Sequence, residues 1–123
     1  MKNVRTYAAN CLKEEAQAIM GLIPLLDDNF DKAVEMMYSC QGKVIVTGVG
    51  KSGHIGAKIA ATLSSTGTPS FFLNPLDAYH GDLGVVTSQD IVVAISNSGQ
   101  TDELLRFVPM LIHMGIPIIG MSG

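Results

Sequence analysis

Charged residues are scarce in this sequence, and basic residues are outnumbered by acidic ones. Charged side chains make up 15% of the 123 residues and only eight are lysine or arginine, which leaves a formal net charge of −3. Nucleic acids and anionic membranes are bound through basic patches, so we expect neither as a partner. With 47% hydrophobic residues, part of the surface is expected to be covered by another copy of the chain, which predicts a homo-oligomer.

The sequence also lacks a long apolar run near its start and has only two cysteines. Lys2 and Arg5 follow Met1, and neither a signal peptide nor a membrane span is recognisable, so the expected compartment is the cytoplasm. Cys11 and Cys40 stand in helix-like segments without metal-ligand spacing. We expect them to be free, packed as small hydrophobic side chains, and we expect no metal site.

The chain has the length of one domain. We interpret residues 1–123 as a single domain with helices in residues 1–40 and an α/β core in residues 43–123. Apolar residues recur at three- and four-residue steps in the first part, which predicts an opening helix of two or more pieces that ends near Pro24 and a second helix around residues 30–38. Both helices should pack their apolar stripes on a surface.

The remainder alternates between short β-branched runs and helical patterns. The predicted strands are 43–47, 70–73, 91–95 and 116–121, the predicted helices are 52–65 and 101–113, and 74–84 is a long connection. Strands that alternate with helices predict a parallel, doubly wound α/β sheet with right-handed crossovers. The expected order is the flavodoxin-like 2-1-3-4, with room for a fifth strand, which makes the first and third strands neighbours at the switch point.

The loop after the first strand, GVGKSG at 48–53, has the composition of an anion site. Free backbone N–H groups and the helix dipole favour an anion there, and Gly50, Lys51 and Ser52 are candidate binding residues. The spacing also satisfies GxGxxG, so a dinucleotide site is an alternative, and an exposed lysine on a tight turn is another. A Walker loop is excluded, because the glycine that it needs would fall on Ile45.

The loop after the third strand, SNSGQT at 96–101, offers three hydroxyls and an amide. Its candidate phosphate-binding residues are Ser96, Asn97, Ser98, Gly99 and Thr101. Serine, threonine and asparagine also favour helix starts for local reasons, so a simple N-cap is the alternative. In the expected strand order both loops meet at one edge of the sheet, and one small phosphorylated ligand held between them explains both.

Two further residues could transfer protons. His80 lies in the long connection, and its imidazole could act as an acid or a base near neutral pH or be an ordinary turn residue. Glu103 follows the serine-rich loop and could be a surface charge at a helix start or a carboxylate of the site.

Three segments resemble the D-arabinose 5-phosphate isomerases, a family of the sugar isomerase (SIS) domain proteins. They are GVGKSGHIG at 48–56, HGDLG at 80–84 and AISNSG at 94–99, and the likeness covers the N-terminal part of that domain. The resemblance implies an incomplete SIS domain from a protein that interconverts D-ribulose 5-phosphate and D-arabinose 5-phosphate, the entry to Kdo synthesis for lipopolysaccharide or capsule. It implies a sugar phosphate as ligand and no cofactor.

The resemblance also implies roles for individual residues. Ser96, Ser98 and Thr101 would hold the phosphate, and Lys51 and Ser52 would line the sugar end of the site. These assignments agree with the anion-binding character of the two loops.

The same resemblance implies that Lys51, His80 and Glu103 are catalytic. His80, acting on a neighbouring subunit's site, and Glu103 would move protons, and Lys51 would steady the enediolate. Gln100 departs from the glutamate usual in the wider family. A further glutamate and histidine of the family lie beyond residue 123, so we expect this chain to bind sugar phosphates but to turn them over slowly by itself. A non-catalytic phosphosugar-binding module or regulatory fragment is the alternative.

Overall fold

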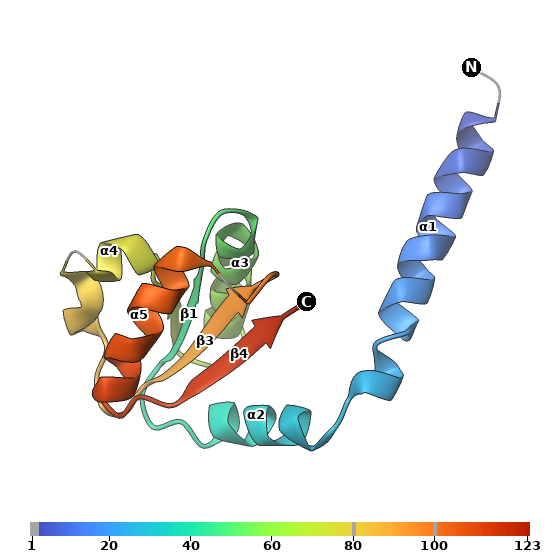
Figure 1. The fold of residues 1–123 in the computed structure, drawn as a ribbon. Coiled ribbons are helices and arrows are strands. Elements are labelled where there is room, and N and C mark those ends of the chain that lie inside the picture. Colours follow the sequence, from blue (N-terminus) through green and yellow to red (C-terminus); the bar gives the residue numbers. More distant parts are fainter. Residues whose placement is uncertain (1–2, 80, 100) are drawn as a thin grey trace. The chain divides into compact units, whose positions relative to one another are not determined.

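The computed structural model describes residues 3–79, 81–99 and 101–123, in two units, Met1–Val34 and Glu35–Gly123. Figure 1 shows the elements in chain order. They are α1 (Val4–Met20), the 3₁₀ turn η1 (Ile23–Leu25), α2 (Asp28–Tyr38), β1 (Val44–Gly48), α3 (Lys51–Ser65), β2 (Ser70–Phe72), α4 (Pro75–Tyr79), the 3₁₀ turn η2 (Asp82–Val85), β3 (Ile91–Ser96), α5 (Asp102–His113) and β4 (Ile118–Ser122).

The four strands form one parallel sheet in the order β2-β1-β3-β4, which confirms the predicted topology. β1 and β3 are rich in valine and isoleucine and almost wholly buried, as expected of strands covered on both faces. Gly48 lies beside Ile95 in the register of β1 and β3, and Ser96 lies beside Ser122 in that of β3 and β4. The loops after β1 and β3 and the end of β4 therefore meet at one edge of the sheet.

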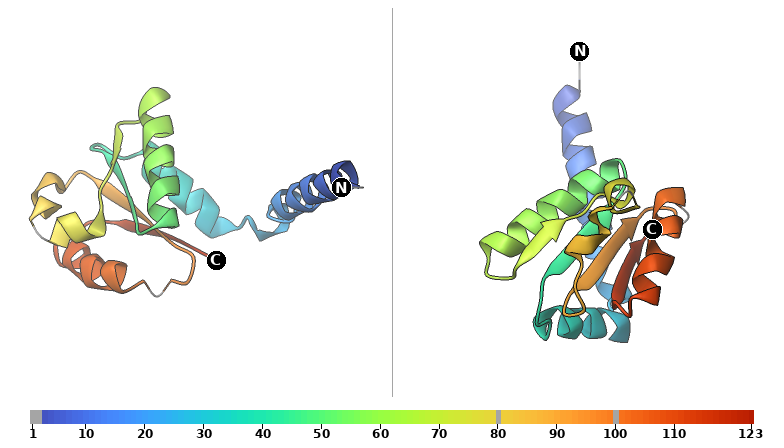
Figure 2. Two further views of the ribbon diagram at one scale, coloured as in Figure 1. Left: turned by 90° about the horizontal axis from the view of Figure 1, so that it is seen from above. Right: turned by 90° about the vertical axis from the view of Figure 1, so that its left-hand side faces the viewer.

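The helices α3 and α5 cover opposite faces of the sheet, as the second view in Figure 2 shows. On the α5 face, the buried core includes Phe107 and Leu111 packed with Ile45. On the α3 face, a side chain on Gly56 would approach Val46 to 3.1 Å, so the missing side chain lets this helix lie close to β1. The strands β1 and β3, from whose ends the two loops begin, are thus packed between the two helices.

The N-terminal unit differs from the sequence prediction in its packing. α1 ends at Met20, before Pro24, which lies inside η1, because Gly21 already caps the helix by donating to the carbonyl of Gln17. No residue of α1 is buried within this unit. The stripe that we expected to lie on a surface is exposed there, and Cys11, free like Cys40, is only half-buried.

Within the segment that was predicted as a long connection, 74–84, the described residues form the helix α4 and the start of the turn η2. The Asn74 side chain accepts the N–H of Leu76 at 2.9 Å, and Pro75, which fits a first helical position, begins α4. β4 begins at Ile118, later than predicted, because Pro117 has no N–H to give to the sheet. Among the described helices, none combines the length and the apolar character needed to cross a membrane.

Candidate functional site

Helix α3 begins directly after β1 through a turn that requires glycine. Gly50, the N-cap of α3, has φ of 61°, in the region that disfavours residues with a side chain, and it provides no side-chain cap. The N–H groups of the first helical turn, at Lys51 and Ser52, have no intrahelical acceptor. Because this turn carries no acidic residue and does carry Lys51, it is a suitable place for an anion.

Close contacts fix this turn against the strands. A Cβ added to Gly53 would lie 2.8 Å from the carbonyl oxygen of Gly48, and one added to Gly48 would lie 3.1 Å from the carbonyl oxygen of Ile95. A side chain at Gly53 would require the backbone to shift, and one at Gly48 would be tightly packed. The glycines of the motif therefore bring the start of α3 next to the end of β3, where the serine-rich loop begins.

The serine-rich loop is held by the buried side chain of Ser96. The Ser96 Oγ lies 2.8 Å from the Thr101 Oγ1 and accepts the N–H of Gly99 at 3.0 Å. Gly99 has φ of 70°, which lets the loop turn back on itself. Asn97 and Ser98 lie on the exposed outer side of this turn.

The loop does not behave as a simple N-cap. Thr101 is the N-cap residue of α5, but its side chain makes no capping hydrogen bond, and its hydroxyl pairs with Ser96 instead. The N–H groups of the first turn of α5 thus have no side-chain cap from Thr101 and can meet a ligand. Asp102 and Glu103, both exposed on this turn, lower its attraction for an anion.

A cavity of about 210 Å³ lies where these segments meet. Its lining comes from the start of α3, the serine-rich loop and the end of β4: Ser52, Ile95, Ser96, Asn97, Met121, Ser122 and Gly123. The structure therefore brings together residues of the two loops that the sequence analysis singled out. Ser52, Ser96 and Asn97 bring hydroxyl and amide groups to a lining that also contains Ile95 and Met121, so a small ligand with polar and apolar parts could bind there.

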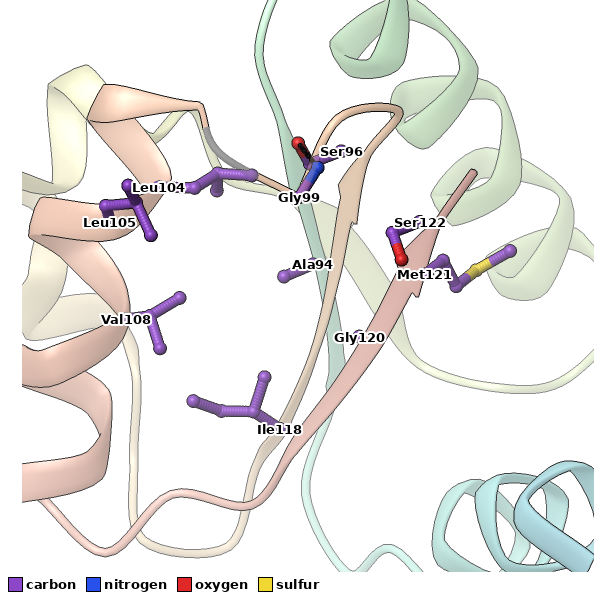
Figure 3. A pocket seen from close by; sticks show the side chains of 10 residues that line it. All are labelled: Ala94, Ser96, Gly99, Leu104, Leu105, Val108, Ile118, Gly120, Met121 and Ser122. Carbon is purple, nitrogen blue, oxygen red and sulfur yellow. Dashed lines mark hydrogen bonds between the residues drawn. The ribbon is translucent and has the colours of Figure 1, made fainter.

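A second cavity, of about 340 Å³, lies between α5 and the strands β3 and β4 (Figure 3). Leu104, Leu105 and Val108 project from α5 on one side, and Ile118 lies on the other. Its walls are mainly apolar, but Ser96, Gly99 and Ser122 stand at the end where it approaches the serine-rich loop. Polar groups are therefore concentrated at the carboxyl ends of the strands.

The predicted catalytic residues are less well defined than the binding loops. Lys51 and Glu103 are exposed, and neither side chain forms an ion pair within the described part of the chain. His80 lies outside the described residues, as does Gln100. Within residues 3–79, 81–99 and 101–123 there is no cluster of three side chains that could hold a metal ion.

The contribution of β4 to the site was not predicted from the sequence. Ser122 and Gly123 line the smaller cavity, and the N–H of Gly123 donates to the carbonyl of Asn97 at 3.0 Å. The signal was present, because the strand order 2-1-3-4 places the end of the fourth strand beside the serine-rich loop. Ser122 and Gly123, at the end of that strand, could have been assigned to the site for this reason.

Comparisons with known proteins agree with this arrangement. A model of the SIS domain matches residues 37–123. The arabinose 5-phosphate isomerase KdsD of Pseudomonas aeruginosa is 50% identical over 109 residues, which are 89% of this chain and 33% of that protein. KdsD of Escherichia coli K12 is 51% identical with the same coverage. This chain thus spans about a third of the length of these curated relatives.

A solved structure shows the same fold around a ligand. This E. coli CFT073 protein, in complex with arabinose 5-phosphate, matches with a TM-score of 0.89 and 43% identity over 99% of this chain and 66% of that one. The likeness therefore includes both the sheet and the loops at its edge. Because the domain model covers most of the chain and the fold agrees with it, the chain belongs to the SIS domain family.

Proposed function

We propose that this chain is the sugar-phosphate-binding part of an aldose–ketose isomerase that interconverts D-ribulose 5-phosphate and D-arabinose 5-phosphate. The observation that carries the proposal is the cavity of about 210 Å³ between Ser52 and the serine-rich loop. Its size suits a pentose phosphate rather than a dinucleotide, and Ser52, Ser96 and Asn97 supply polar groups to a lining that also has apolar residues. The names of the curated relatives and the arabinose 5-phosphate complex of the similar structure support the choice of sugar.

In this proposal the phosphate binds at the serine-rich loop. Ser96, Ser98 and Thr101 offer hydroxyls, and Asn97 and Gly99 offer main-chain groups beside the uncapped start of α5. Gly50, Lys51 and Ser52 approach from the start of α3, where Lys51 supplies a positive charge. A ligand held by both loops would have its phosphate near the serine-rich loop and its sugar near the start of α3.

The chemistry of the proposed reaction is the movement of protons within the sugar. A base removes the proton from the carbon next to the carbonyl, which gives an enediolate, and the proton returns to the neighbouring carbon while an acid moves a proton between the oxygens. Glu103 and His80 are the proposed proton-transfer groups, His80 toward a neighbouring subunit. Lys51 would stabilise the negative charge on the enediolate oxygen.

We further propose that the protein works as a cytoplasmic homo-oligomer in Kdo synthesis. The low share of charged residues supports self-association, and the low number of basic residues gives no support for nucleic-acid or membrane binding. We also propose that residues 1–123 belong to one domain, with helices in residues 1–40 and the α/β core in residues 43–123.

The proposal predicts that the serine-rich loop recognises phosphate. Replacing Ser96→Ala together with Ser98→Ala should weaken D-arabinose 5-phosphate binding by about 100-fold or more, because two hydrogen bonds to a charged group, each worth about 1.5–3 kcal/mol, are lost. Binding of free D-arabinose should change much less. Isothermal titration calorimetry with both ligands measures this, with Ser88→Ala, an exposed serine remote from the loop in sequence, as the control. Equal losses for the two ligands would contradict the proposal.

A further inference from the structure

Ser122 occupies a position beside the serine-rich loop that has no assigned role. It is the last residue of β4 and lies next to Ser96 in the register of the parallel pair β3 and β4. Residues paired in this way extend their side chains toward the same face of the sheet. Ser122 lines both the smaller and the larger cavity, as does Ser96.

The end of β4 is held in place against the loop. The N–H of Gly123 donates to the carbonyl of Asn97, and a Cβ added to Gly123 would lie 2.5 Å from the Asn97 Oδ1. Glycine at this position therefore allows the end of β4 to approach the loop closely. Ser122, one residue earlier, has its backbone fixed by this contact and by the sheet.

The Ser122 hydroxyl is available to a ligand. In the described part of the chain this hydroxyl forms no hydrogen bond with another residue. Gly99 adds no side chain on that side, and the place of its Cβ would be 3.8 Å from the Cβ of Ser122. Figure 3 shows the Ser122 side chain across from Gly99 at the open end of the cavity.

The surroundings of Ser122 favour a neutral polar group over a phosphate. Its preceding neighbours along the strand are Met121, which is apolar, and Gly120, which has no side chain, so the strand supplies no charge there. The N–H groups and the lysine that would balance a phosphate belong to the starts of α3 and α5 instead. A single hydroxyl, which both donates and accepts one hydrogen bond, matches the hydroxyl of a sugar.

We propose that Ser122 binds a hydroxyl of the pentose while the serine-rich loop binds the phosphate, so that β4 contributes to the choice of sugar. This inference rests on the proposed function, because it takes a pentose 5-phosphate as the ligand. Because Ser122 lies beside Ser96 and Gly99, it would meet a sugar hydroxyl close to the phosphate end of the ligand. Ser122 is then a specificity residue of the site.

The test measures binding of D-arabinose 5-phosphate and of inorganic phosphate to this chain by calorimetry. Ser122→Ala should weaken D-arabinose 5-phosphate binding by about 3- to 10-fold, the worth of one neutral hydrogen bond. Phosphate binding should stay within about twofold of its value in the unsubstituted chain. Ser122→Thr, which keeps a hydroxyl, should bind more tightly than Ser122→Ala, and Ser88→Ala should bind as the unsubstituted chain does.

The possible outcomes separate the inference from the proposed function. If the unsubstituted chain binds no D-arabinose 5-phosphate, the proposed function fails and takes the inference with it. If that chain binds it but Ser122→Ala binds equally well, the inference alone fails. Equal weakening for D-arabinose 5-phosphate and for inorganic phosphate would also overturn the inference, because Ser122 would then act on the phosphate.

Discussion

At the residue scale, the carboxylate of Asp90 joins the first and third strands at the end of the sheet opposite the site. It is buried, it accepts the N–H of Lys43 at 2.7 Å and that of Thr87 at 2.8 Å, and its Oδ2 lies 3.4 Å from the Lys43 Nζ. Burial raises the pKa of the Asp90 carboxyl. The hydrogen bonds from Lys43 and Thr87 and the Lys43 charge outweigh burial, so this pKa lies below its usual value.

The lowered pKa predicts a pH-dependent contribution to stability. The folded state binds the Asp90 proton more weakly than the unfolded state does, so the stabilisation is full above the ordinary carboxyl pKa of about 3.9 and is lost as the pH falls through the lower folded value. Asp90→Asn should reduce the free energy of unfolding at pH 7 by about 2 kcal/mol. Urea unfolding from pH 7 down to pH 3 measures this.

The variant also has a characteristic pH profile. The difference between Asp90→Asn and the unsubstituted chain should shrink toward pH 3, because the unfolded form of the unsubstituted chain then takes up the Asp90 proton more readily than the folded form does. Glu14→Gln, at an exposed position of α1, should leave stability nearly unchanged. A difference for Asp90→Asn that stays constant from pH 7 to pH 3 would mean that the charge of Asp90 contributes nothing.

At the scale of elements, the contact of α3 with β1 sets the geometry of the glycine loop. In Gly53→Ala the new Cβ would fall 2.8 Å from the Gly48 carbonyl oxygen, a backbone atom that cannot turn away. Such overpacking costs about 1–3 kcal/mol, partly offset by the better helix propensity of alanine, so we expect a net loss of about 1–2 kcal/mol. Thermal or urea unfolding gives the value.

A matched glycine provides the control. A Cβ on Gly120 in β4 would meet no atom within 4 Å, and this residue is not in the left-handed region, so Gly120→Ala should be neutral or slightly stabilising. If Gly53→Ala proves as stable as Gly120→Ala, α3 can move away from β1 without cost. The close packing would then be no reason for glycine at position 53.

Some of these elements could be predicted from the sequence and others could not. The sheet order and the two loops were predictable, because continuous valine and isoleucine runs indicate buried parallel strands and glycine or serine follows them. The pairing of Thr101 with Ser96, in place of a cap, was not, because it depends on tertiary distances. The short helix α4 was missed because five residues give no measurable periodicity, and it depends on the Asn74 cap and on packing of Ala78 in the core.

At the scale of the whole molecule, the N-terminal unit has a large apolar surface and no core of its own. α1 is 17 residues long and buries none of its side chains within the unit, so it lacks the tertiary packing from which most helices in proteins gain their stability. Large hydrophobic side chains of this unit that are more than half exposed include Val4, Tyr7, Leu12, Ile19, Met20 and Leu25. Covering each one would contribute about 1.5–3 kcal/mol, which favours association with a second copy.

Self-association through α1 should therefore be sensitive to a charge on its apolar side. Leu12 and Ile19 are seven residues apart, two helical turns, and each is 67% exposed, so Leu12→Glu places a carboxylate within this surface. We expect the unsubstituted chain to sediment as an oligomer at micromolar concentration and Leu12→Glu to shift it toward monomer. Gln17→Glu adds the same charge on another side of the helix and should leave the oligomer intact. A monomeric unsubstituted chain, or equal association of both variants, would show that α1 is not the contact surface.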